Sequence, residues 1–199
     1  GLGDVYKRQM FCSYCIIPHS RGGFRSKPLE DIVSEVSALA EAGYKEVVLT
    51  GINLSFYGVD LGLRLVDAIE SVCGIDGIER VRLGSIEPQV ISDTDVKRLA
   101  EQKKLCPQFH LSLQSGCGKT LKAMNRRYDP AQYESIVNLL RTNFDNCSIT
   151  TDIMVGFPGE TDGDFAESIR FAETIGFAKA HIFAYSRRKG TPAAEMAGQ

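Results

Sequence analysis

The chain has little of several features that would narrow its class at once. Its 199 residues contain no run of 18 apolar residues, so the sequence predicts no membrane-spanning helix. The net charge is only −2, so any contact with nucleic acid is expected to be local or to belong to another domain. No secretory signal pattern stands at the start, and we expect a cytoplasmic protein. Apolar residues at 43% and charged residues at 24% are typical of a globular domain.

Cysteines are few and mostly scattered. They stand at positions 12, 15, 73, 106, 117 and 147. An even number could form disulfides, but that arrangement suits small secreted chains. Only Cys12 and Cys15 form a C-x-x-C pair, which favours a metal or redox role. A G-x-G-x-x-G pattern is also missing, which weakens a dinucleotide-binding interpretation.

Short apolar runs alternate with amphipathic stretches along the chain. Strands are predicted at 46–50, 80–83, 109–113, 148–155 and 180–184, and helices at 29–42, 63–72, 92–103, 130–143 and 161–175. With a first strand before Cys12, the repeat occurs about six times, which predicts an α/β protein with a parallel sheet. A doubly wound open sheet and a partial β/α barrel both satisfy the pattern. In either one, ligand-binding residues lie at the carboxyl ends of the strands.

Polar or glycine residues of a functional type accompany every predicted strand. In chain order they are Cys12 and Cys15, Gly51 and Asn53, Ser85 and Glu87, Gln114 and Ser115, Asp152 with Gly156, Pro158 and Gly159, and finally Tyr185 and Ser186. Polar loops are ordinary in α/β proteins, and they would explain one or two such positions. Because all six strands show them, we infer one shared site.

The motifs together resemble those of the radical S-adenosylmethionine (SAM) methylthiotransferases. The segment FCSYCIIPHSRGGFRS is similar to that family's cluster-binding segment. LTGINLSFYG, GSIEP, FHLSLQSGCGKTLKAMNRRY, TTDIMVGFPGET and HIFAYSRRKGTPAAEM follow in the family's order. The resemblance implies a partial (β/α)6 TIM-like barrel, the radical SAM core.

Three segments resemble most the members that act on tRNA threonylcarbamoyladenosine: 109–117, 124–128 and 181–191. That likeness implies addition of a methylthio group at C2 of this modified adenosine, next to the anticodon. The alternatives are a methylthiotransferase for isopentenyladenosine in tRNA, a radical SAM enzyme of another substrate class, or a non-catalytic SAM-binding fragment.

The resemblance implies two cofactors, a [4Fe–4S] cluster and SAM. Three cysteines would bind the cluster and leave one iron for SAM. Cys12 and Cys15 match the second and third of these, and the first would stand at position 8, where this chain has Arg8. We therefore interpret residues 1–9 as a non-native segment that replaced a cysteine. A redox role for the pair is the alternative.

The resemblance also assigns the SAM contacts. Thr50 and Gly51 would meet the methionyl amine through their backbone, and Glu87 would accept from that amine. Gln114 and Asp152 would hold the ribose hydroxyls, Arg126 the methionyl carboxylate, and Gly156 and Pro158 the adenine. Asn53 and Ser85 complete the set. A solvated Arg126–Arg127 pair and a plain turn at Glu87–Pro88 are the alternatives.

The same resemblance sets the domain organisation. Residues 10–190 would form the core, and residues 191–199 would begin a linker to a C-terminal RNA-binding domain. An N-terminal domain would hold a second [4Fe–4S] cluster. In the full-length protein the partners would be the anticodon loop of tRNA and a reductant such as flavodoxin or ferredoxin, so we expect this fragment alone to be inactive. Five basic residues could contact tRNA phosphates or be solvated: Arg21, Arg25, Arg187, Arg188 and Lys189.

Overall fold

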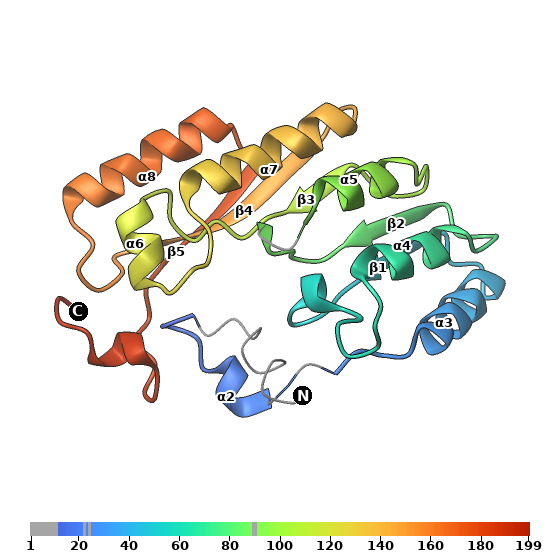
Figure 1. Cartoon of the computed structure of the whole chain (residues 1–199), viewed down its shortest axis with the longest axis horizontal. Helices are drawn as coiled ribbons and strands as arrows, with labels where there is room; N and C mark the ends of the chain where they lie inside the picture. Colours follow the sequence, from blue (N-terminus) through green and yellow to red (C-terminus); the bar gives the residue numbers. More distant parts are fainter. Residues whose placement is uncertain (1–11, 22, 24, 89–90) are drawn as a thin grey trace. The chain divides into compact units, whose positions relative to one another are not determined.

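The computed structural model describes residues 12–21, 23, 25–88 and 91–199. The chain forms two compact units (Figure 1). Unit 1 consists of residues 1–23, 111–137 and 149–199, and unit 2 of residues 24–110 and 138–148. The predicted first strand and Arg8 lie outside the described residues.

Unit 2 alternates strands and helices as the sequence predicts. Its elements are α3 (Leu29–Glu41), β1 (Glu46–Leu49), the 3-10 helix η1 (Leu54–Phe56), α4 (Leu65–Cys73), β2 (Arg80–Leu83), α5 (Asp93–Ala100) and β3 (Gln108–His110). Strands β1 and β2 pair in parallel from Glu46 opposite Arg80 to Leu49 opposite Leu83. Their carboxyl ends therefore lie side by side, which brings the loops after both strands to the same edge.

The local sequence explains where these helices begin and end. Helix α3 ends in a Schellman motif, in which Gly43 takes φ +91° and the backbone N–H of Tyr44 donates to the carbonyl of Leu39 at 3.0 Å. Ser92 caps α5, because its hydroxyl accepts from the backbone N–H of Asp95. The helix stops at Ala100, three residues before its predicted end.

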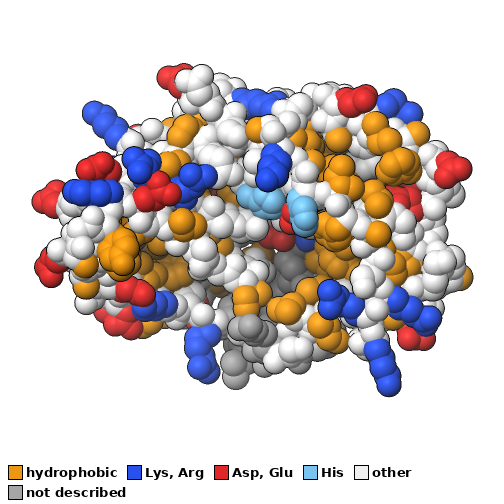
Figure 2. Space-filling model, turned by 180° about the vertical axis from the view of Figure 1, so that it is seen from behind, with side chains coloured by type: hydrophobic (Ala, Val, Ile, Leu, Met, Phe, Trp, Pro, Cys, Tyr) orange, Lys and Arg blue, Asp and Glu red, His pale blue; other side chains and the backbone are white. Residues whose placement is uncertain are grey.

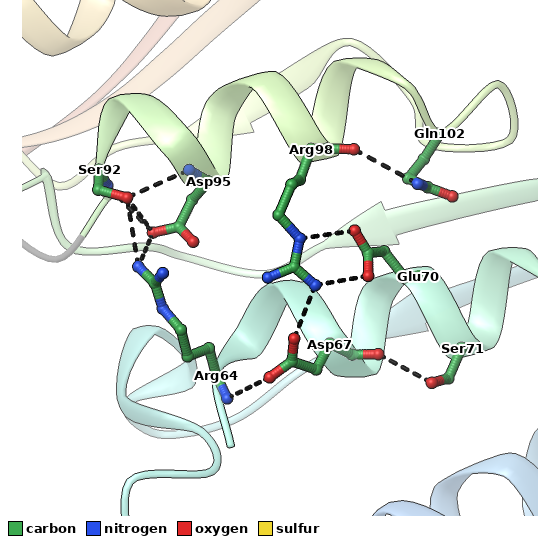
Figure 3. Close-up of polar contacts among 8 residues, drawn as sticks. All are labelled: Arg64, Asp67, Glu70, Ser71, Ser92, Asp95, Arg98 and Gln102. Carbon is green, nitrogen blue, oxygen red and sulfur yellow. Dashed lines mark hydrogen bonds and ion pairs between the residues drawn. The ribbon is translucent and has the colours of Figure 1, made fainter. Parts of the chain in front are cut away.

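Charged side chains join α4 to α5 (Figure 3). The Arg98 guanidinium donates to both carboxylate oxygens of Glu70, at 2.9 and 2.6 Å, and to Asp67 at 2.7 Å. Arg64, just before α4, pairs with Asp95 of α5. A planar guanidinium holds two carboxylates in a fixed geometry, so this network fixes the position of α4 relative to α5. Beneath it, the buried side chains Ile69, Val72, Val81, Val96 and Phe109 form the core of unit 2.

Unit 1 contains the second pair of parallel strands. Its elements are α2 (Ile17–Arg21), α6 (Gly118–Ala123), α7 (Pro130–Asn143) up to residue 137, β4 (Ser148–Val155) from residue 149, α8 (Asp162–Ile175), β5 (Lys179–Ala184) and the 3-10 helix η3 (Pro192–Glu195). Strands β4 and β5 pair from Thr150 opposite Lys179 to Val155 opposite Ala184. Helices α7 and α8 meet over β4, where the buried Tyr133 ring lies 6.1 Å from that of Phe171. The short helices α2 and α6 were not predicted from the sequence.

The segment after β3 departs from the prediction of one strand over 109–113. The backbone N–H of Leu111 donates to Thr150 of β4 at 2.9 Å, but that of Leu113 donates instead to the Thr151 hydroxyl at 2.9 Å. A side chain thus replaces a carbonyl in the ladder. Regular strand geometry is lost immediately before Gln114, whose backbone takes φ +67°.

The end of the chain packs against other segments of unit 1, to which it belongs. Residues 191–199 were predicted to begin a linker; within them, residues 192–195 form η3, whose Ala193 and Ala194 are fully buried. The backbone N–H of Ala193 donates to the carbonyl of Ser13 at 2.8 Å. Among the helices that the structure describes, none is long and apolar enough to cross a membrane.

Candidate functional site

Unit 1 holds the two cysteines of the predicted cluster segment on a tight turn. The backbone N–H of Cys15 donates to the carbonyl of Cys12 at 3.0 Å, and that of Ser13 donates to Met124 at 2.9 Å. Cys12 is buried and Cys15 is half-buried. Burial raises the pKa of the Cys15 thiol, while Arg188 and Arg126 act in the opposite direction. The turn thus presents two thiols from a rigid backbone.

A buried guanidinium lies against this turn. Arg126 donates to Cys12 Sγ at 3.2 Å, to the Tyr128 hydroxyl at 3.0 Å and to the carbonyl of Ser112 at 3.3 Å. It is only 9% exposed, so the alternative of a solvated pair with Arg127 does not hold, although Arg127 itself is exposed. A positive charge held beside the cysteines suits an anionic ligand group, and its predicted contact with the methionyl carboxylate stays a prediction.

Gln114 and Asp152, both predicted to hold the ribose hydroxyls, are joined through their backbones. The backbone N–H of Gln114 donates to the carbonyl of Asp152 at 2.8 Å. The Gln114 side chain is 8% exposed, and its Oε1 is a buried atom with no hydrogen-bond partner. A buried amide oxygen without a partner costs roughly 1–3 kcal/mol, and the left-handed backbone adds strain of similar order. Such a position is typical of a binding site.

Residues of β5 add to this group in a way the sequence did not indicate. His181 stands opposite Asp152 in the β4–β5 register, and its Nδ1 lies 3.5 Å from Asp152 Oδ1. The imidazole is mostly exposed and the carboxylate is half-buried. Alternation within the apolar run at 180–184 could have placed His181 on one face of the sheet, but only the register shows which residue it faces.

Unit 1 also contains a buried apolar cluster. Met124, Met154, Phe157 and Ala193 form a buried cluster, against which Tyr14 and Tyr185 pack among others. The ring of Phe157 lies between Gly156 and Pro158 in the chain and meets the edge of Tyr14 at 6.3 Å. At Gly156, with φ +69°, a Cβ would meet no atom within 4 Å. The open space there fits the predicted contact with a flat heterocycle.

Unit 2 carries the remaining predicted residues at the edge where β1 and β2 end. Thr50 and Gly51 follow β1, and a Cβ added at Gly84 would lie 3.6 Å from Thr50 Cα. The backbone N–H of Glu87 donates to the Ser55 hydroxyl at 2.7 Å, which ties the loop after β2 to the loop after β1. In the chain, Asn53 stands between Thr50 and Ser55, and Ser85 is exposed. Asn53 Oδ1 is a second buried oxygen with no partner.

These residues fit, in kind, the two cofactors that the resemblance implies. Each unit holds one buried oxygen that can accept a hydrogen bond from a polar ligand, Gln114 Oε1 in unit 1 and Asn53 Oδ1 in unit 2. Soft thiolates are the ligands that iron–sulfur clusters require, and Cys12 and Cys15 supply two. Within the described residues no group of three or more potential metal ligands occurs. Position 8, where the third thiolate is expected, lies outside them.

Comparison with known proteins gives these features a context. A family model described as the Radical SAM superfamily matches residues 9–172. Solved structures that are similar at low sequence identity share the fold. One is a radical S-adenosylmethionine methyltransferase, TsrM, from Kitasatospora setae (TM-score 0.74, 17% identity, covering 92% of this chain and 36% of that one). Another is methylornithine synthase, PylB (TM-score 0.67, 15% identity, covering 96% and 54%). The partial barrel is thereby confirmed over the open sheet.

Curated relatives are considerably more similar in sequence. A tRNA-2-methylthio-N(6)-dimethylallyladenosine synthase of Thermoanaerobacter sp. (strain X514) is 42% identical over 98% of this chain and 42% of its own length. The threonylcarbamoyladenosine tRNA methylthiotransferase MtaB of Thermotoga maritima is 44% identical over 94% of this chain and 43% of its own length. The predicted resemblance is confirmed, and the chain spans about two fifths of the length of these relatives.

Proposed function

The chain belongs to the Radical SAM superfamily, and from that premise we propose that it is the SAM-binding core of a tRNA methylthiotransferase. Membership of the superfamily implies a [4Fe–4S] cluster and SAM. In the full-length protein, the reaction would add a methylthio group at C2 of N6-threonylcarbamoyladenosine next to the anticodon.

One observation carries the proposal. Identity of 42–44% extends over 94% or more of this chain to enzymes named for 2-methylthio modification or methylthiotransfer on tRNA. The predicted site residues lie within the matched span and carry the polar and thiol groups that such a core needs. Similarity to the solved structures supports the fold only.

The chain's own residues divide the task between binding, orientation and exclusion of water. Bound together, a [4Fe–4S] cluster and SAM supply one-electron cleavage of a carbon–sulfur bond. Cys12 and Cys15 would hold iron through their thiolates. Arg126 would balance negative charge beside them. The apolar cluster around Phe157 would exclude water from the reacting atoms.

The other binding roles follow from the buried oxygens of Gln114 and Asn53, which have no partner, and from the places of Asp152 and Glu87 on or after strands. Gln114 and Asp152 would accept from the ribose hydroxyls, and Asn53 and Glu87 would accept from other donors of SAM. Because backbone hydrogen bonds already order these segments, holding each acceptor in place loses little conformational entropy. Thr50, Gly51, Ser85, Gly156 and Pro158 would meet the ligand mainly through shape and backbone.

Further parts of the protein would complete the reaction. We propose an N-terminal domain with a second [4Fe–4S] cluster, a C-terminal RNA-binding domain, a reductant such as flavodoxin or ferredoxin, and a cytoplasmic location. The core would comprise residues 10–190. Without the added domains, this chain alone would not methylthiolate tRNA.

A second substrate has a specific observation in its favour. Several relatives at 42–44% identity are named for dimethylallyladenosine, which is the isopentenyladenosine of the alternative. The threonylcarbamoyl form is supported by segments 109–117, 124–128 and 181–191 and by the MtaB relative. The two substrates differ at N6, while the reacting C2 position is common to both.

Mass spectrometry of tRNA nucleosides tests the proposal. The full-length gene would be expressed in a bacterial strain that lacks its own methylthiotransferases but makes both modified adenosines. We expect 2-methylthio-N6-threonylcarbamoyladenosine to appear. Appearance of the methylthio dimethylallyl nucleoside alone would favour the second substrate, and appearance of neither would refute methylthiotransfer to tRNA.

A further inference from the structure

Three consecutive cations follow β5 in unit 1. Arg187, Arg188 and Lys189 are all exposed, and together they are called the basic turn. The carbonyl of Arg188 accepts from the hydroxyl and the backbone N–H of Thr191, at 2.7 and 3.2 Å. Gly190 takes φ +86°, which a tight turn requires here and which other residues rarely adopt. The three side chains therefore extend from an ordered backbone.

The basic turn is fixed at both ends. Before it, the backbone N–H of Tyr185 donates to the carbonyl of Val155 in β4 at 2.8 Å. After it, Thr191 is 2% exposed and Ala193 is bonded to Ser13. Because little chain entropy remains to be lost, binding through this turn would cost less than binding through a mobile loop.

The charges of the basic turn are not neutralised by neighbouring carboxylates. Within the described residues, none of its three side chains forms an ion pair or a hydrogen bond that the structure records. Other exposed cations do pair: Lys27 with Glu35, Lys45 with Glu79, and Lys97 with Asp93. On the face drawn in Figure 2, lysine and arginine side chains are likewise interspersed with aspartate and glutamate. The basic turn is thus a local positive patch on a chain of net charge −2.

The patch adjoins the cysteine turn. A Cβ added at Gly190 would lie 3.5 Å from Ile16 Cδ1, directly after Cys15 in the chain. Ser13, between the two cysteines, accepts the hydrogen bond from Ala193 at 2.8 Å. The unpaired cations therefore lie beside the place where the reacting cofactors are proposed to bind.

We propose that the basic turn, Arg187–Arg188–Lys189, binds backbone phosphates of the RNA substrate next to the nucleotide that is modified. This inference rests on the proposed function for the choice of RNA. Guanidinium and ammonium groups bind phosphates without reading sequence, so the turn would set the position of the strand rather than select a base. A partner held at this point would place a nearby base at the cofactors.

Fluorescence anisotropy tests the proposal with the 199-residue chain and a short labelled RNA hairpin that has an anticodon-type loop. The variant Arg187→Gln/Arg188→Gln/Lys189→Gln removes the three charges. The matched control, Lys27→Gln/Lys45→Gln/Lys97→Gln, removes three exposed charges that are paired with carboxylates. A third variant, Arg187→Lys/Arg188→Lys, keeps the charge. Circular dichroism melts would check that all four proteins remain folded.

The expected result is a loss of affinity in the basic-turn variant of roughly tenfold or more at about 50 mM salt. Each phosphate contact in a single strand contributes about 0.7 to the slope of log affinity against log salt, so that slope should fall by about 2. The paired-charge control should change affinity less than about twofold, and the lysine variant should retain most of the slope. Equal losses in the basic-turn variant and the control, or no RNA binding by the unaltered chain, would overturn the proposal.

The RNA-binding measurement and the nucleoside measurement in cells together separate this inference from the proposed function. If RNA binding depends on the basic turn but no methylthio nucleoside forms in cells, the surface is supported and the reaction is not. If the nucleoside forms and the basic-turn variant binds RNA normally, the reaction is supported and this surface is refuted.

Discussion

Replacing Gly116 with alanine should destabilise unit 1 because no room exists for a side chain there. A Cβ at this position would lie 2.8 Å from Phe171 Cβ and 2.8 Å from the carbonyl oxygen of Ser168, both in α8. The backbone N–H of Gly116 also donates to the Ser168 hydroxyl at 2.6 Å. Gly116 thus lets α8 pack closely on the segment that carries Gln114.

The size of the effect follows from these contacts. Forcing an extra methyl group into a packed interior costs about 1–3 kcal/mol. Displacing α8 would also break a buried hydrogen bond, at about 1–2 kcal/mol more. The sum is about 2–5 kcal/mol, which for a chain of this size lowers the melting temperature by roughly 4 to 20 °C.

Thermal and urea unfolding followed by circular dichroism would measure the change. Gly163→Ala is the matched control, because it lies in α8 itself and its Cβ would meet only the Thr161 hydroxyl, at 3.7 Å. That substitution should leave stability unchanged or raise it by up to about 1 kcal/mol. If Gly116→Ala and Gly163→Ala were equally stable, the close approach of α8 to this segment would be wrong.

Three further predictions concern other contacts of the fold. Gly58→Ala should lower the free energy of unfolding by at least about 2 kcal/mol in urea titrations, because Gly58 has φ +82° and an added Cβ would lie 2.6 Å from the Leu63 carbonyl. An unchanged free energy of unfolding would refute this turn geometry. Arg98→Met should lower the melting temperature by breaking the α4–α5 network. The difference in melting temperature from the unaltered protein should shrink in 1 M salt, where charges are screened over ~3 Å. A difference that does not depend on salt would argue against an ionic cause. Hydrogen bonds from Lys119 and Thr161 hold the pKa of Asp164 well below its usual range. The ionised carboxylate therefore stabilises the folded state fully above its unfolded-state pKa of about 4, and this contribution is lost as the pH falls. The stability advantage over Asp164→Asn should be full at neutral pH and disappear in acid; an advantage that persists in acid would contradict the assignment.

Sequence patterns predicted the helices and strands well where apolar residues recurred regularly over many positions and where a clear cap residue marked the helix end. The helices predicted at 92–103 and 161–175 do begin at Ser92 and Thr161, where each hydroxyl accepts from the backbone N–H of the acidic residue three positions later. Strand ends also predicted which residues share an edge. The loops after β1 and β2 meet through Glu87 and Ser55, as parallel pairing requires.

Contacts between residues far apart in the sequence could not be predicted in this way. The hydrogen bond from Arg126 to Cys12 joins residues 114 positions apart. His181 faces Asp152 only because of the register of β4 and β5. The left-handed backbone of Gln114 arises where the Thr151 hydroxyl interrupts the ladder. Each depends on the packing of several elements at once, and no local pattern encodes it.

Cleavage of SAM tests the central claim, that this chain is the SAM-binding core of a radical enzyme. The chain with Arg8→Cys would be loaded with iron and sulfide under anaerobic conditions, reduced with dithionite and incubated with SAM, and 5′-deoxyadenosine would be measured by mass spectrometry. The unaltered chain and Arg8→Cys/Cys12→Ser are the controls. We predict 5′-deoxyadenosine from the Arg8→Cys protein, and little or none from either control, because each control lacks one of three thiolates. An Arg8→Cys protein that takes up no more iron than the unaltered chain, or that holds the cluster and leaves SAM intact, would contradict the account.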